Sequence, residues 1–426
     1  MTWTVTTLRG AAEVRLGRQR APQYADGPNM IPYLRAANVK DGVLDLGDIL
    51  SMNFSPQEQS VFALRSGDVL VTEGSGSIGS VGASAVWRGE LQGTVAFQNT
   101  LIRLRPRPGV DGRFLAWWAR SAFGSGIFAS VASGANIYHL SAERIRALSF
   151  NLPANDEQRR IADFLDSETA RLDRLVSVQV RTRSALQERR AASMFELVTG
   201  GSYANRVDSG LHWVDSLPAL WRSVKVNFVA KMGSGHTPSR SNPEWWVDCT
   251  IPWITTGEVS QVRDDRQEVI TETRERISDL GVANSSAELH PVGTVVLSRT
   301  ASAGFSAIMG QDMATSQDFA TWTCGPALDP YYLLWCLRAM RSDLLGRLAM
   351  GSTHKTIYVP DLQGLRIPIP TISEQGEIVG KIRESNSQID HLVDVIDQQR
   401  SLLAERRQAL ITAAVTGQLD VTTARG

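Results

Sequence analysis

Two long stretches of the chain combine a helical spacing of apolar residues with an absence of helix breakers. Neither 155–199 nor 381–416 contains a proline or a glycine. Asn155 and Ser373, each followed by acidic residues, are suitable helix caps near the start of these stretches. The pattern predicts two helices of about 40 residues, each roughly 60 Å long at a rise of 1.5 Å per residue.

Leucine and isoleucine recur at heptad spacing along both stretches. The repeated positions are Leu165, Leu172, Leu175 and Leu186 in the first stretch and Ile382, Ile389, Leu392, Ile396, Leu403 and Leu410 in the second. So narrow a stripe is typical of the seam of a two-helix coiled coil. We therefore expect the helices to pair, with Gln179, Thr182 and Gln399 as register-setting positions, packing defects or partner contacts. The alternative is that each helix packs on its own domain.

The segments that precede these helices have a different pattern. Glycine, proline and serine separate short β-branched runs, such as 68–72 and 294–298, which are typical of strands. One aromatic-rich run in each segment, 114–122 and 331–340, has helical spacing. Each segment is therefore expected to form a mixed domain of helices and strands.

The chain consists of two copies of one unit, offset by 217 or 218 residues. Matched positions include Trp3 with Trp221, Gly17 with Gly235, Glu157-Gln158 with Glu374-Gln375 and Val198-Thr199-Gly200 with Val415-Thr416-Gly417. So long a period means that each copy contains a domain of its own. The expected fold class is α+β: two pseudo-repeated mixed α/β domains separated by a long antiparallel two-helix coiled coil, with one domain at each end. The expected boundaries are 1–155 and 201–370 for the domains and 156–200 and 371–420 for the helices.

Composition excludes several classes of protein. Lys and Arg together number 44 and so do Asp and Glu, which excludes a polycationic surface but not a local basic face. The three cysteines form no CxxC pair and the six histidines lack metal-ligand spacing, so we expect neither disulfides nor a metal site. The longest apolar stretches, such as 331–337, are far short of the roughly 20 residues of a membrane span, and 1–10 lacks the pattern of a signal peptide. We expect a reduced, cytoplasmic protein that does not contact membranes.

Two short motifs raise the question of catalysis. Gly74-Ser75-Gly76-Ser77-Ile78-Gly79 is a GxGxxG sequence directly after a predicted strand, but its counterpart 299–304 keeps only the last glycine. Asp329-Pro330-Tyr331-Tyr332 lacks the second proline of the amino-methyltransferase motif, and its tyrosines open an aromatic helix that favours core packing. We therefore expect no catalytic residue and no bound cofactor in this chain. The alternative is a self-sufficient nucleotide-dependent enzyme, whose cofactor binding would depend on Gly74, Gly76 and Gly79.

An ordered set of short segments gives the chain a family resemblance. The set comprises Leu217-Pro218-Ala219-Leu220-Trp221, Gly235-His236-Thr237-Pro238-Ser239, Ile251-Pro252-Trp253-Ile254, Gly351-Ser352-Thr353, Glu374-Gln375, Glu405-Arg406-Arg407 and Ala414-Val415-Thr416-Gly417-Gln418-Leu419-Asp420. With two variable domains alternating with two similar helices, the chain resembles the specificity subunit of type I restriction-modification enzymes. The match is better in the second half, because the first copy has Gly17-Arg18-Gln19-Arg20-Ala21-Pro22 and Gly134-Ala135-Asn136 at the corresponding turns.

The resemblance implies a function and a set of partners. In that family each domain is a target recognition domain that recognises one half of a split sequence in double-stranded DNA. The helices set the spacing between the halves and dock two modification (methyltransferase) subunits, which restriction subunits join. S-adenosylmethionine would then belong to the modification subunits, and ATP and Mg to the restriction subunits. The chain itself would be a non-catalytic scaffold.

Base recognition requires polar side chains on loops beside a groove, with Arg favouring guanine and Asn or Gln favouring adenine. Candidates in the first domain are Arg35, Asn38, Ser75, Ser77, Gln98, Asn99, Asn136, Tyr138 and His139. Candidates in the second domain are Thr255, Thr256, Arg299, Thr300, Gln317, Thr353, His354 and Lys355. For each of them, a role in loop capping or in the solvated surface is the alternative. The 74–79 loop is equally well explained as a backbone contact to DNA and as a structural turn.

Charge and geometry set the remaining expectations. Residues 1–155 hold 15 basic and 11 acidic side chains, whereas 201–370 hold 15 and 17, so we expect the isolated chain to bind DNA weakly. Two half-site readers on one face of a duplex need a separation of roughly 34 to 36 Å, which a stiff helical spacer provides. The alternative function is a coiled-coil adaptor whose domains bind proteins or glycans.

Overall fold

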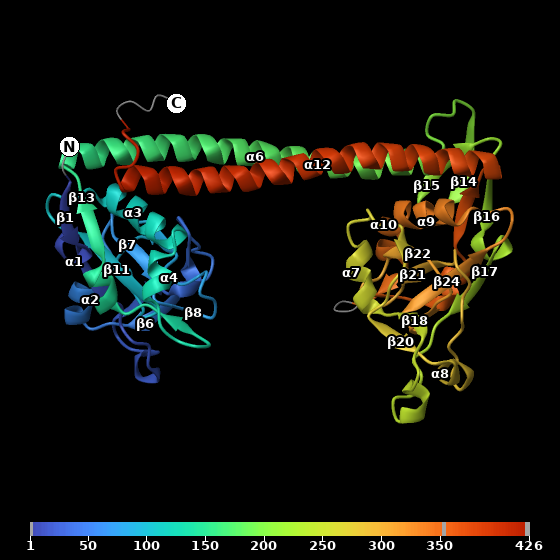
Figure 1. Cartoon of the computed structure of the whole chain (residues 1–426), viewed down its shortest axis with the longest axis horizontal. Coiled ribbons are helices and arrows are strands. Elements are labelled where there is room, and N and C mark those ends of the chain that lie inside the picture. Colours follow the sequence, from blue (N-terminus) through green and yellow to red (C-terminus); the bar gives the residue numbers. More distant parts are fainter. Residues whose placement is uncertain (1–2, 352–354, 422–426) are drawn as a thin grey trace. The chain divides into compact units, whose positions relative to one another are not determined.

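The structure is a computed structural model that describes residues 3–351 and 355–421 (Figure 1). Thr353 and His354 therefore lie outside the described residues. The chain divides into two compact units, one formed by residues 1–179 with 398–426 and the other by residues 180–397. Each unit contains one mixed domain together with parts of both long helices, so each is described by itself.

Domain 1 is built on a four-stranded antiparallel sheet in the order β2-β11-β7-β9. A three-stranded sheet, β10-β3-β6, and three two-stranded pairings, β1-β13, β12-β8 and β4-β5, complete its strands. Its strands are β1 (Thr4–Thr7), β2 (Ala12–Leu16), β3 (Met30–Leu34), β4 (Val39–Lys40), β5 (Val43–Leu44), β6 (Leu50–Asn53), β7 (Val69–Thr72), β8 (Gly74–Ser75), β9 (Ser84–Val86), β10 (Ala96–Phe97), β11 (Leu101–Pro106), β12 (Tyr138–His139) and β13 (Ser149–Leu152). Its helices are α1 (Leu8–Ala11), α2 (Pro56–Phe62), α3 (Gly112–Gly124), α4 (Ile127–Val131) and α5 (Ala142–Ala147), with 3₁₀ turns at Pro22–Tyr24 and Ala36–Asn38.

Domain 2 is built on a sheet in the order β17-β24-β21-β22-β19, with β20-β18-β23 beside it and further pairs β14-β15, β16-β27 and β25-β26. Its strands are β14 (Arg206–Leu211), β15 (Val214–Pro218), β16 (Arg222–Lys225), β17 (Ala230–Ser234), β18 (Ile251–Ile254), β19 (Val269–Ile270), β20 (Glu275–Ile277), β21 (Val295–Ser298), β22 (Ser306–Met309), β23 (Ala314–Thr315), β24 (Phe319–Cys324), β25 (Ala349–Met350), β26 (Thr356–Ile357) and β27 (Arg366–Ile369). Its helices are α7 (Val259–Val262), α8 (Asp279–Ala283), α9 (Pro330–Ala339), α10 (Arg341–Asp343) and α11 (Val359–Gln363), with 3₁₀ turns at Val226–Phe228, Pro243–Trp246 and Thr256–Glu258 and a π-helical turn at Leu344–Leu348.

The two domains share one topology, which confirms the internal repeat. The order β2-β11-β7-β9 in domain 1 corresponds to β17-β24-β21-β22 in domain 2. The parallel pairing of β10 with β3 corresponds to that of β23 with β18. Strand register is kept as well, since Leu101 lies opposite Thr72 in domain 1 and Phe319 lies opposite Ser298 in domain 2.

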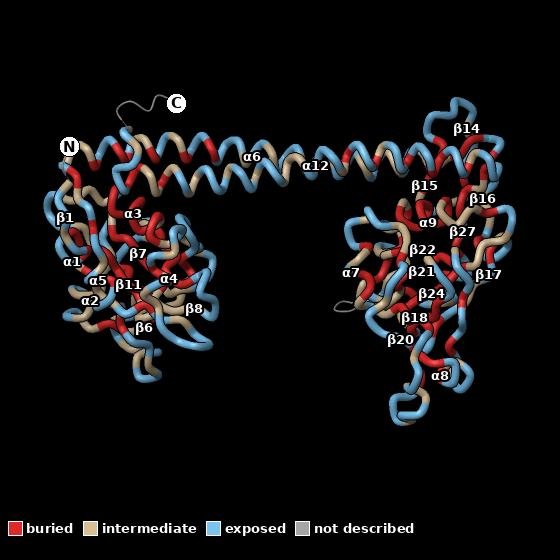
Figure 2. Tube along the Cα trace, in the orientation of Figure 1, coloured by how far each residue is buried: buried red, intermediate tan, exposed pale blue. Residues whose placement is uncertain are grey.

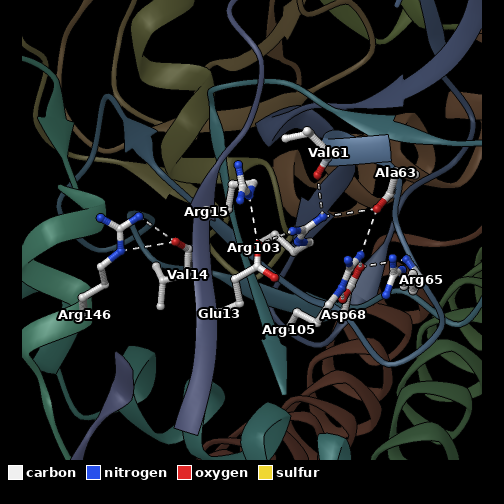
Figure 3. Close-up of polar contacts among 10 residues, drawn as sticks. All are labelled: Glu13, Val14, Arg15, Val61, Ala63, Arg65, Asp68, Arg103, Arg105 and Arg146. Atoms are coloured by element: carbon white, nitrogen blue, oxygen red, sulfur yellow. Dashed lines mark hydrogen bonds and ion pairs between the residues drawn. The ribbon is translucent and has the colours of Figure 1, made fainter. Parts of the chain in front are cut away.

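The sheet of domain 1 contains a buried ionic network around Arg103 and Arg105 of β11 (Figure 3). Arg105 on β11 makes two hydrogen bonds of 2.7 Å to the carboxylate of Asp68, whose side chain is only 1% exposed. Arg103, also 1% exposed, donates to Glu13 at 3.0 Å and to the carbonyl of Ala63 at 3.2 Å. Bonds of this kind offset much of the loss of hydration of the two guanidinium groups, although the Nε of Arg103 has no hydrogen-bond partner.

The two predicted helices are confirmed as α6 (Asn155–Thr199) and α12 (Ile372–Val415). The cap of α12 is Thr371 rather than the predicted Ser373: the Thr371 hydroxyl accepts a hydrogen bond from the amide of Glu374 at 3.3 Å. Asn155 is likewise not a cap: it is the first residue of α6, and its side chain donates to the carbonyl of Gly109 at 3.2 Å. Both predicted caps lie within the first turn of their helices, because the helices begin one to two residues earlier than the sequence pattern indicated.

The start of each long helix is fixed to its domain by the same buried glutamine. Gln158 accepts a hydrogen bond from the amide of Asp111 at 2.8 Å and donates to the carbonyl of Pro153 at 2.8 Å. Gln375 accepts from the amide of Asp329 at 2.8 Å and donates to the carbonyl of Pro370 at 3.1 Å. The matched Glu-Gln pairs of the sequence therefore mark a structural joint.

The two long helices pair antiparallel in both units. In the first unit Asp173 accepts from Arg407 at 2.6 Å, and Gln179 donates to Gln399 at 3.0 Å. In the second unit Arg190 pairs with Asp390 at 2.8 Å, and Arg183 lies 3.2 Å from Asp397. Ascending residue numbers on α6 thus meet descending numbers on α12. Gln179 and Gln399 are confirmed as a polar pair between the helices, whereas Thr182 is exposed.

The predicted seam is correct at most positions and wrong at two. Leu165, Leu172, Ile382 and Ile389 are buried, and Leu186, Ile396, Leu403 and Leu410 are half-buried. Leu175 and Leu392 are exposed, at 47% and 49%. The covered stripe continues from Leu172 to Val176 and from Ile389 to Val393, four residues on, so the positions three residues on turn outward.

Each helix also packs on a domain, so the two alternatives for the helices are both realised. Leu165 belongs to the core of domain 1 and Ile382 to the core of domain 2. Ile411 and Val415 of α12 complete the core of domain 1, and Val198 of α6 completes that of domain 2. Figure 2 shows the buried residues gathered inside the domains, while exposed residues predominate along the helix surfaces.

The polar contacts between domain and helix differ between the units. In the first unit Arg113 of α3 lies 3.1 Å from Asp166 of α6, and the indole of Trp117 donates to the same carboxylate at 2.9 Å. In the second unit both senses occur: Arg383 of the helix lies 2.6 Å from Glu268 of the domain, and Arg266 of the domain lies 2.7 Å from Asp394 of the helix.

Candidate nucleic-acid interface

Several loops of domain 1 are held together by hydrogen bonds between their backbones. Gln98 donates to the carbonyl of Leu34 at 2.8 Å, and Arg18 donates to that of Phe97 at 3.1 Å. Glu73 donates to the carbonyl of Thr100 at 2.9 Å, and its own carbonyl accepts from Leu140 at 2.7 Å. We call this set loop cluster 1. It comprises 17–18, 34–38, 73–77, 97–100 and 136–140.

Domain 2 repeats the same four hydrogen bonds. Ser316 donates to the carbonyl of Ile254 at 2.9 Å, and His236 donates to that of Thr315 at 3.0 Å. Arg299 donates to the carbonyl of Asp318 at 2.8 Å, and its own carbonyl accepts from Ile357 at 2.8 Å. Loop cluster 2 comprises 235–237, 254–258, 299–300, 315–318 and 355–357. The two domains therefore present corresponding loops on corresponding frames.

A close backbone approach explains the matched glycines of the repeat. A Cβ atom at Gly17 would lie 2.2 Å from the carbonyl oxygen of Gln98, and one at Gly235 would lie 2.0 Å from that of Thr315. Neither neighbour can move away, because both are backbone atoms of the cluster. Only glycine allows these loops to meet.

Most of the residues proposed from the sequence lie in these two clusters. In loop cluster 1, Ser77, Asn136 and His139 are exposed, whereas Ser75, Gln98, Asn99 and Tyr138 are half-buried. Tyr138 and His139 form β12, which pairs with Gly74 and Ser75 of β8. Arg35 forms an ion pair with Asp48, so part of its charge is already neutralised. The structure thus brings together side chains from four separate parts of the sequence.

Asn38 is not displayed on the surface, contrary to expectation. It is 2% exposed, and its carboxamide donates to the carbonyls of Asp45 at 2.9 Å and Asp48 at 3.0 Å. Its side-chain oxygen accepts from the amide of Arg35 at 3.0 Å. Because these bonds occupy the carboxamide, Asn38 fixes the loop that carries Arg35 and leaves the set of candidate base-contacting residues.

Several candidates of loop cluster 2 also support the loops themselves. Thr255 caps a 3₁₀ turn, donating to Glu258 at 2.8 Å, and the hydroxyl of Thr300 donates to Asp318. Gln317 accepts from the hydroxyl of Thr237 at 2.6 Å. Thr256 and Lys355 are exposed, and Lys355 donates to the carbonyl of Leu345 at 3.4 Å.

Two positions in the clusters were missed from the sequence. Glu73 forms an ion pair with His139 at 3.2 Å, in the centre of loop cluster 1. His236 is exposed in loop cluster 2, although its counterpart Arg18 is buried beside Glu58 and stacks on Tyr24 at 3.6 Å. Counted from the matched strands, Glu73 corresponds to Arg299, so the sequence alignment that paired 74–79 with 299–304 was wrong by one residue.

The two motifs that suggested catalysis have structural explanations. After Gly79 the chain turns into strand β9 without an intervening helix, so the strand-loop-helix arrangement of a nucleotide site is missing there. Asp329 caps α9 by accepting from the amide of Tyr331 at 2.7 Å, and Tyr332 is fully buried, which confirms the core-packing interpretation. Burial raises the pKa of the Cys324 thiol to about 12 and also raises that of Cys336, so neither thiol is an ionised nucleophile at neutral pH.

The described residues form neither a cluster of metal ligands nor a membrane-spanning helix. Residues 3–351 and 355–421 hold no group of three or more His, Cys, Asp and Glu side chains that could bind a metal ion. Within the same ranges, no helix has the length and apolar character that crossing a membrane requires.

Two copies of a mixed α/β domain, each followed by a long helix, define a tandem-repeat protein with two similarly built loop surfaces. Residues 1–176 and 218–390 match the family model described as the type I restriction modification DNA specificity domain. The chain belongs to this family, which confirms the resemblance found in the sequence.

Curated relatives support this assignment over nearly the whole chain. The putative type I restriction enzyme MjaX specificity subunit of Methanocaldococcus jannaschii is 20% identical over 440 residues, covering 99% of this chain and 94% of that protein. The EcoKI specificity subunit of Escherichia coli is 22% identical, covering 98% of this chain and 88% of that protein. The alignment with the MjaIX specificity subunit of M. jannaschii, at 25% identity, spans 42% of that protein.

Solved structures support the fold. A chain from a study of complex assembly and conformational transition of the type I R-M system superposes with a TM-score of 0.73 at 18% identity, covering 98% of both chains. The HsdS subunit from Thermoanaerobacter tengcongensis gives a TM-score of 0.55 at 18% identity, covering 98% of this chain and 97% of that one.

Proposed function

We propose that this chain is the DNA-recognising subunit of a type I restriction-modification complex and recognises a bipartite, asymmetric target. The observation that carries the proposal is the repeated frame of the two loop clusters. Both clusters are held by the same four backbone hydrogen bonds, yet they carry different polar side chains. Two loop clusters with the same backbone arrangement but different polar side chains are suited to recognise two different half-sites.

The helices α6 and α12 act as the spacer between the half-sites. Antiparallel pairing through Asp173–Arg407 and Arg190–Asp390 stiffens both of them. A helix of 45 residues is about 68 Å long at 1.5 Å per residue, which exceeds the roughly 34 to 36 Å between successive major-groove segments. The additional helix length lies at the two ends, where each helix packs on a domain.

Catalysis belongs to partners in this proposal. Two modification subunits dock on the helices and supply S-adenosylmethionine-dependent methyl transfer, and restriction subunits supply ATP- and Mg-dependent chemistry. The chain itself is non-catalytic and works in the cytoplasm. The exposed Leu175 and Leu392, which the helix pair leaves uncovered, are suited to contact such partners.

The decisive experiment maps methylation in a host that carries the modification subunit with and without this chain. We expect a bipartite motif, with two different halves, that disappears when the chain is deleted. An unchanged methylation pattern would contradict the proposal and favour the adaptor alternative, in which the domains bind proteins or glycans.

Binding by the purified chain provides a second test. Because neither domain has a large positive surplus, we expect weak DNA binding with a shallow salt dependence until the modification subunits are added. Tight, sequence-selective binding by the chain alone would contradict this expectation.

A further inference from the structure

One position in each loop cluster is joined through its backbone to two other loops of the cluster. Glu73 directly follows strand β7 and Arg299 directly follows strand β21. At both positions the amide donates to one neighbouring loop and the carbonyl accepts from another. The backbone is thereby held from two sides, so the chemistry presented at this place depends on the side chain alone.

In domain 1 the position carries a carboxylate that a histidine holds in place. Both carboxylate oxygens of Glu73 lie 3.2 Å from Nδ1 of His139, and the Glu73 side chain is 19% exposed. Gly74 leaves room for the imidazole, because a Cβ there would lie 3.1 Å from the same nitrogen. A carboxylate repels DNA phosphates, but it is the group that accepts a hydrogen bond from the cytosine N4 amino group.

In domain 2 the same position carries a guanidinium without a partner in the described structure. The Nε of Arg299 is buried and has no hydrogen-bond acceptor, and no residue in 3–351 or 355–421 forms an ion pair with this side chain. The nearby carboxylate of Asp318 is instead occupied by the hydroxyls of Thr300 and Ser316. An unsatisfied buried donor is costly, and a bound acceptor removes that cost. Arginine meets the O6 and N7 acceptors of guanine in a bidentate fashion.

Building on the function proposed above, we propose that Glu73 and Arg299 recognise the corresponding base pair of the two half-sites. Glu73 selects cytosine on the strand that faces its loop, and Arg299 selects guanine on the strand that faces its own. His139 is a positioning residue that orients the Glu73 carboxylate. The two half-sites therefore contain a C·G pair at corresponding places, presented in opposite orientation to the two domains.

Methylation mapping with variant complexes tests this assignment. The complex of this chain with its modification subunits would carry E73Q, R299K or H139A, and the methylated motif would be compared with that of the unaltered complex. We expect E73Q and H139A to relax the same cytosine position in one half, and R299K to relax one guanine position in the other. Loss of one good contact should reduce discrimination at that position by about 5- to 150-fold. R299K keeps the positive charge but loses the planar fork, so overall DNA attraction is preserved.

Matched controls make the same kind of change at exposed sites outside the clusters. E143Q on α5 is the control for E73Q in domain 1, and R222K on β16 is the control for R299K in domain 2; both side chains are exposed. These variants should leave every position of the motif unchanged. If a cluster variant no longer methylates, its binding to duplexes with single substituted base pairs replaces methylation as the readout.

The outcomes separate this inference from the proposed function. A bipartite motif that stays unchanged in E73Q and R299K, or that relaxes at many positions at once, overturns the inference and leaves the function intact. Equal loss of binding to every duplex also overturns it. If the unaltered complex yields no bipartite motif that depends on this chain, the proposed function itself fails.

Discussion

Asp68 and Arg105 form a buried ion pair in domain 1, whereas the same sites of domain 2 hold Thr294 and Thr323. The two hydroxyls are 3.0 Å apart, so a neutral hydrogen bond replaces the ionic one in an otherwise matching sheet. Removal of one member of a buried ion pair leaves the other charge without compensation, which is more costly than removal of both.

Asp68→Ala should destabilise domain 1 by about 3 to 5 kcal/mol, because the guanidinium of Arg105 then remains buried without its partner. The double variant D68T/R105T should recover most of this loss, because it copies the solution found in domain 2. Urea unfolding of the full chain and hydrogen exchange at β7 and β11 measure the stability of both variants. Asp48→Ala serves as a control that should cost at most about 1 kcal/mol, because the Asp48 side chain is 72% exposed. A double variant less stable than D68A would contradict the argument.

At the scale of single residues, the sequence identifies polar residues near strand ends, but it does not show which of them are buried and which lie in a loop cluster. Arg35, Asn38 and Glu73 are all polar residues near strand ends, yet Asn38 is buried as a loop support and Glu73 lies at the centre of a cluster. Their roles depend on hydrogen bonds to segments distant in the chain, such as the one from Leu140 to Glu73. No local pattern encodes such partners, although the repeat alignment does identify matched positions.

At the scale of elements, the start of helix α12 shows how a local signal can be displaced. The hydroxyl of Thr371 donates to Glu374 at 2.7 Å and accepts from the Glu374 amide at 3.3 Å, forming a reciprocal cap. Hydrogen bonds from the Thr371 hydroxyl and amide lower the pKa of Glu374 below its usual 4.5.

Thr371→Ala should weaken the first turn of α12 by about 1 kcal/mol and speed amide exchange there about fivefold. Because the folded pKa of Glu374 lies below the unfolded one, its stabilisation is complete above about pH 4.5 and disappears as the pH falls through the folded pKa. Hydrogen exchange at Glu374 and Gln375 between pH 3 and 7 measures both effects. Ser373→Ala, at the predicted but incorrect cap, should change neither.

The sequence was sufficient to predict that the two helices form a coiled-coil seam, but it identified only some of the residues that the seam covers. Heptad spacing correctly identified Leu172 and Ile389 as covered positions. It failed at Leu175 and Leu392 because the intervening covered positions lie four residues after Leu172 and Ile389, at Val176 and Val393, and not three residues after them. Which of the two spacings holds depends on the partner helix and on the domains at the helix ends.

Insertion of seven residues into both α6 and α12, opposite one another near Gln179 and Gln399, should lengthen the spacer by about 10 Å. At 3.4 Å per base pair, the gap between the half-sites should grow by about three base pairs. Methylation mapping should show the same bases in both halves. If the insertion changed base identity instead, the spacer role of the helices would be wrong.

At the scale of the whole molecule, the core of domain 1 includes residues from the far end of the sequence. Ile411, Ala414 and Val415 are at most 2% exposed and pack in the same core as Phe114 and Leu165. The hydroxyl of Ser121 on α3 also donates to Thr412 at 3.1 Å. Domain 1 is therefore not complete within its own stretch of sequence.

Ile411→Ala should destabilise domain 1 by about 2 to 5 kcal/mol, because it removes buried methyl groups from that core. The loss should appear as faster hydrogen exchange in β7 and β11, more than 300 positions earlier in the chain. Leu402→Ala, on the same helix but 56% exposed, is the matched control and should have little effect. Unchanged exchange in domain 1 of I411A would show that α12 does not support this core.

Most of the architecture could be predicted from the sequence, because it rests on signals that are local or repeated. The two helices, the two domains and their equivalence follow from breaker-free stretches and from matched pairs such as Trp3 and Trp221. The sequence did not show that α12 completes the core of domain 1 and that α6 completes the core of domain 2. The apolar pattern of Ile411 to Val415 fits a coiled-coil seam and a contact with a domain equally well.

The contribution of α12 to domain 1 has a consequence for how the protein is made. During synthesis on the ribosome, domain 1 emerges first and lacks Ile411, Ala414 and Val415 until domain 2 has also been translated. The nascent first domain thus exposes an apolar face throughout that interval, where a chaperone can bind. The core of domain 1 is completed only when the last turns of α12 have been translated. We therefore expect truncated chains that lack these turns to keep an exposed apolar face and to be more susceptible to proteolysis.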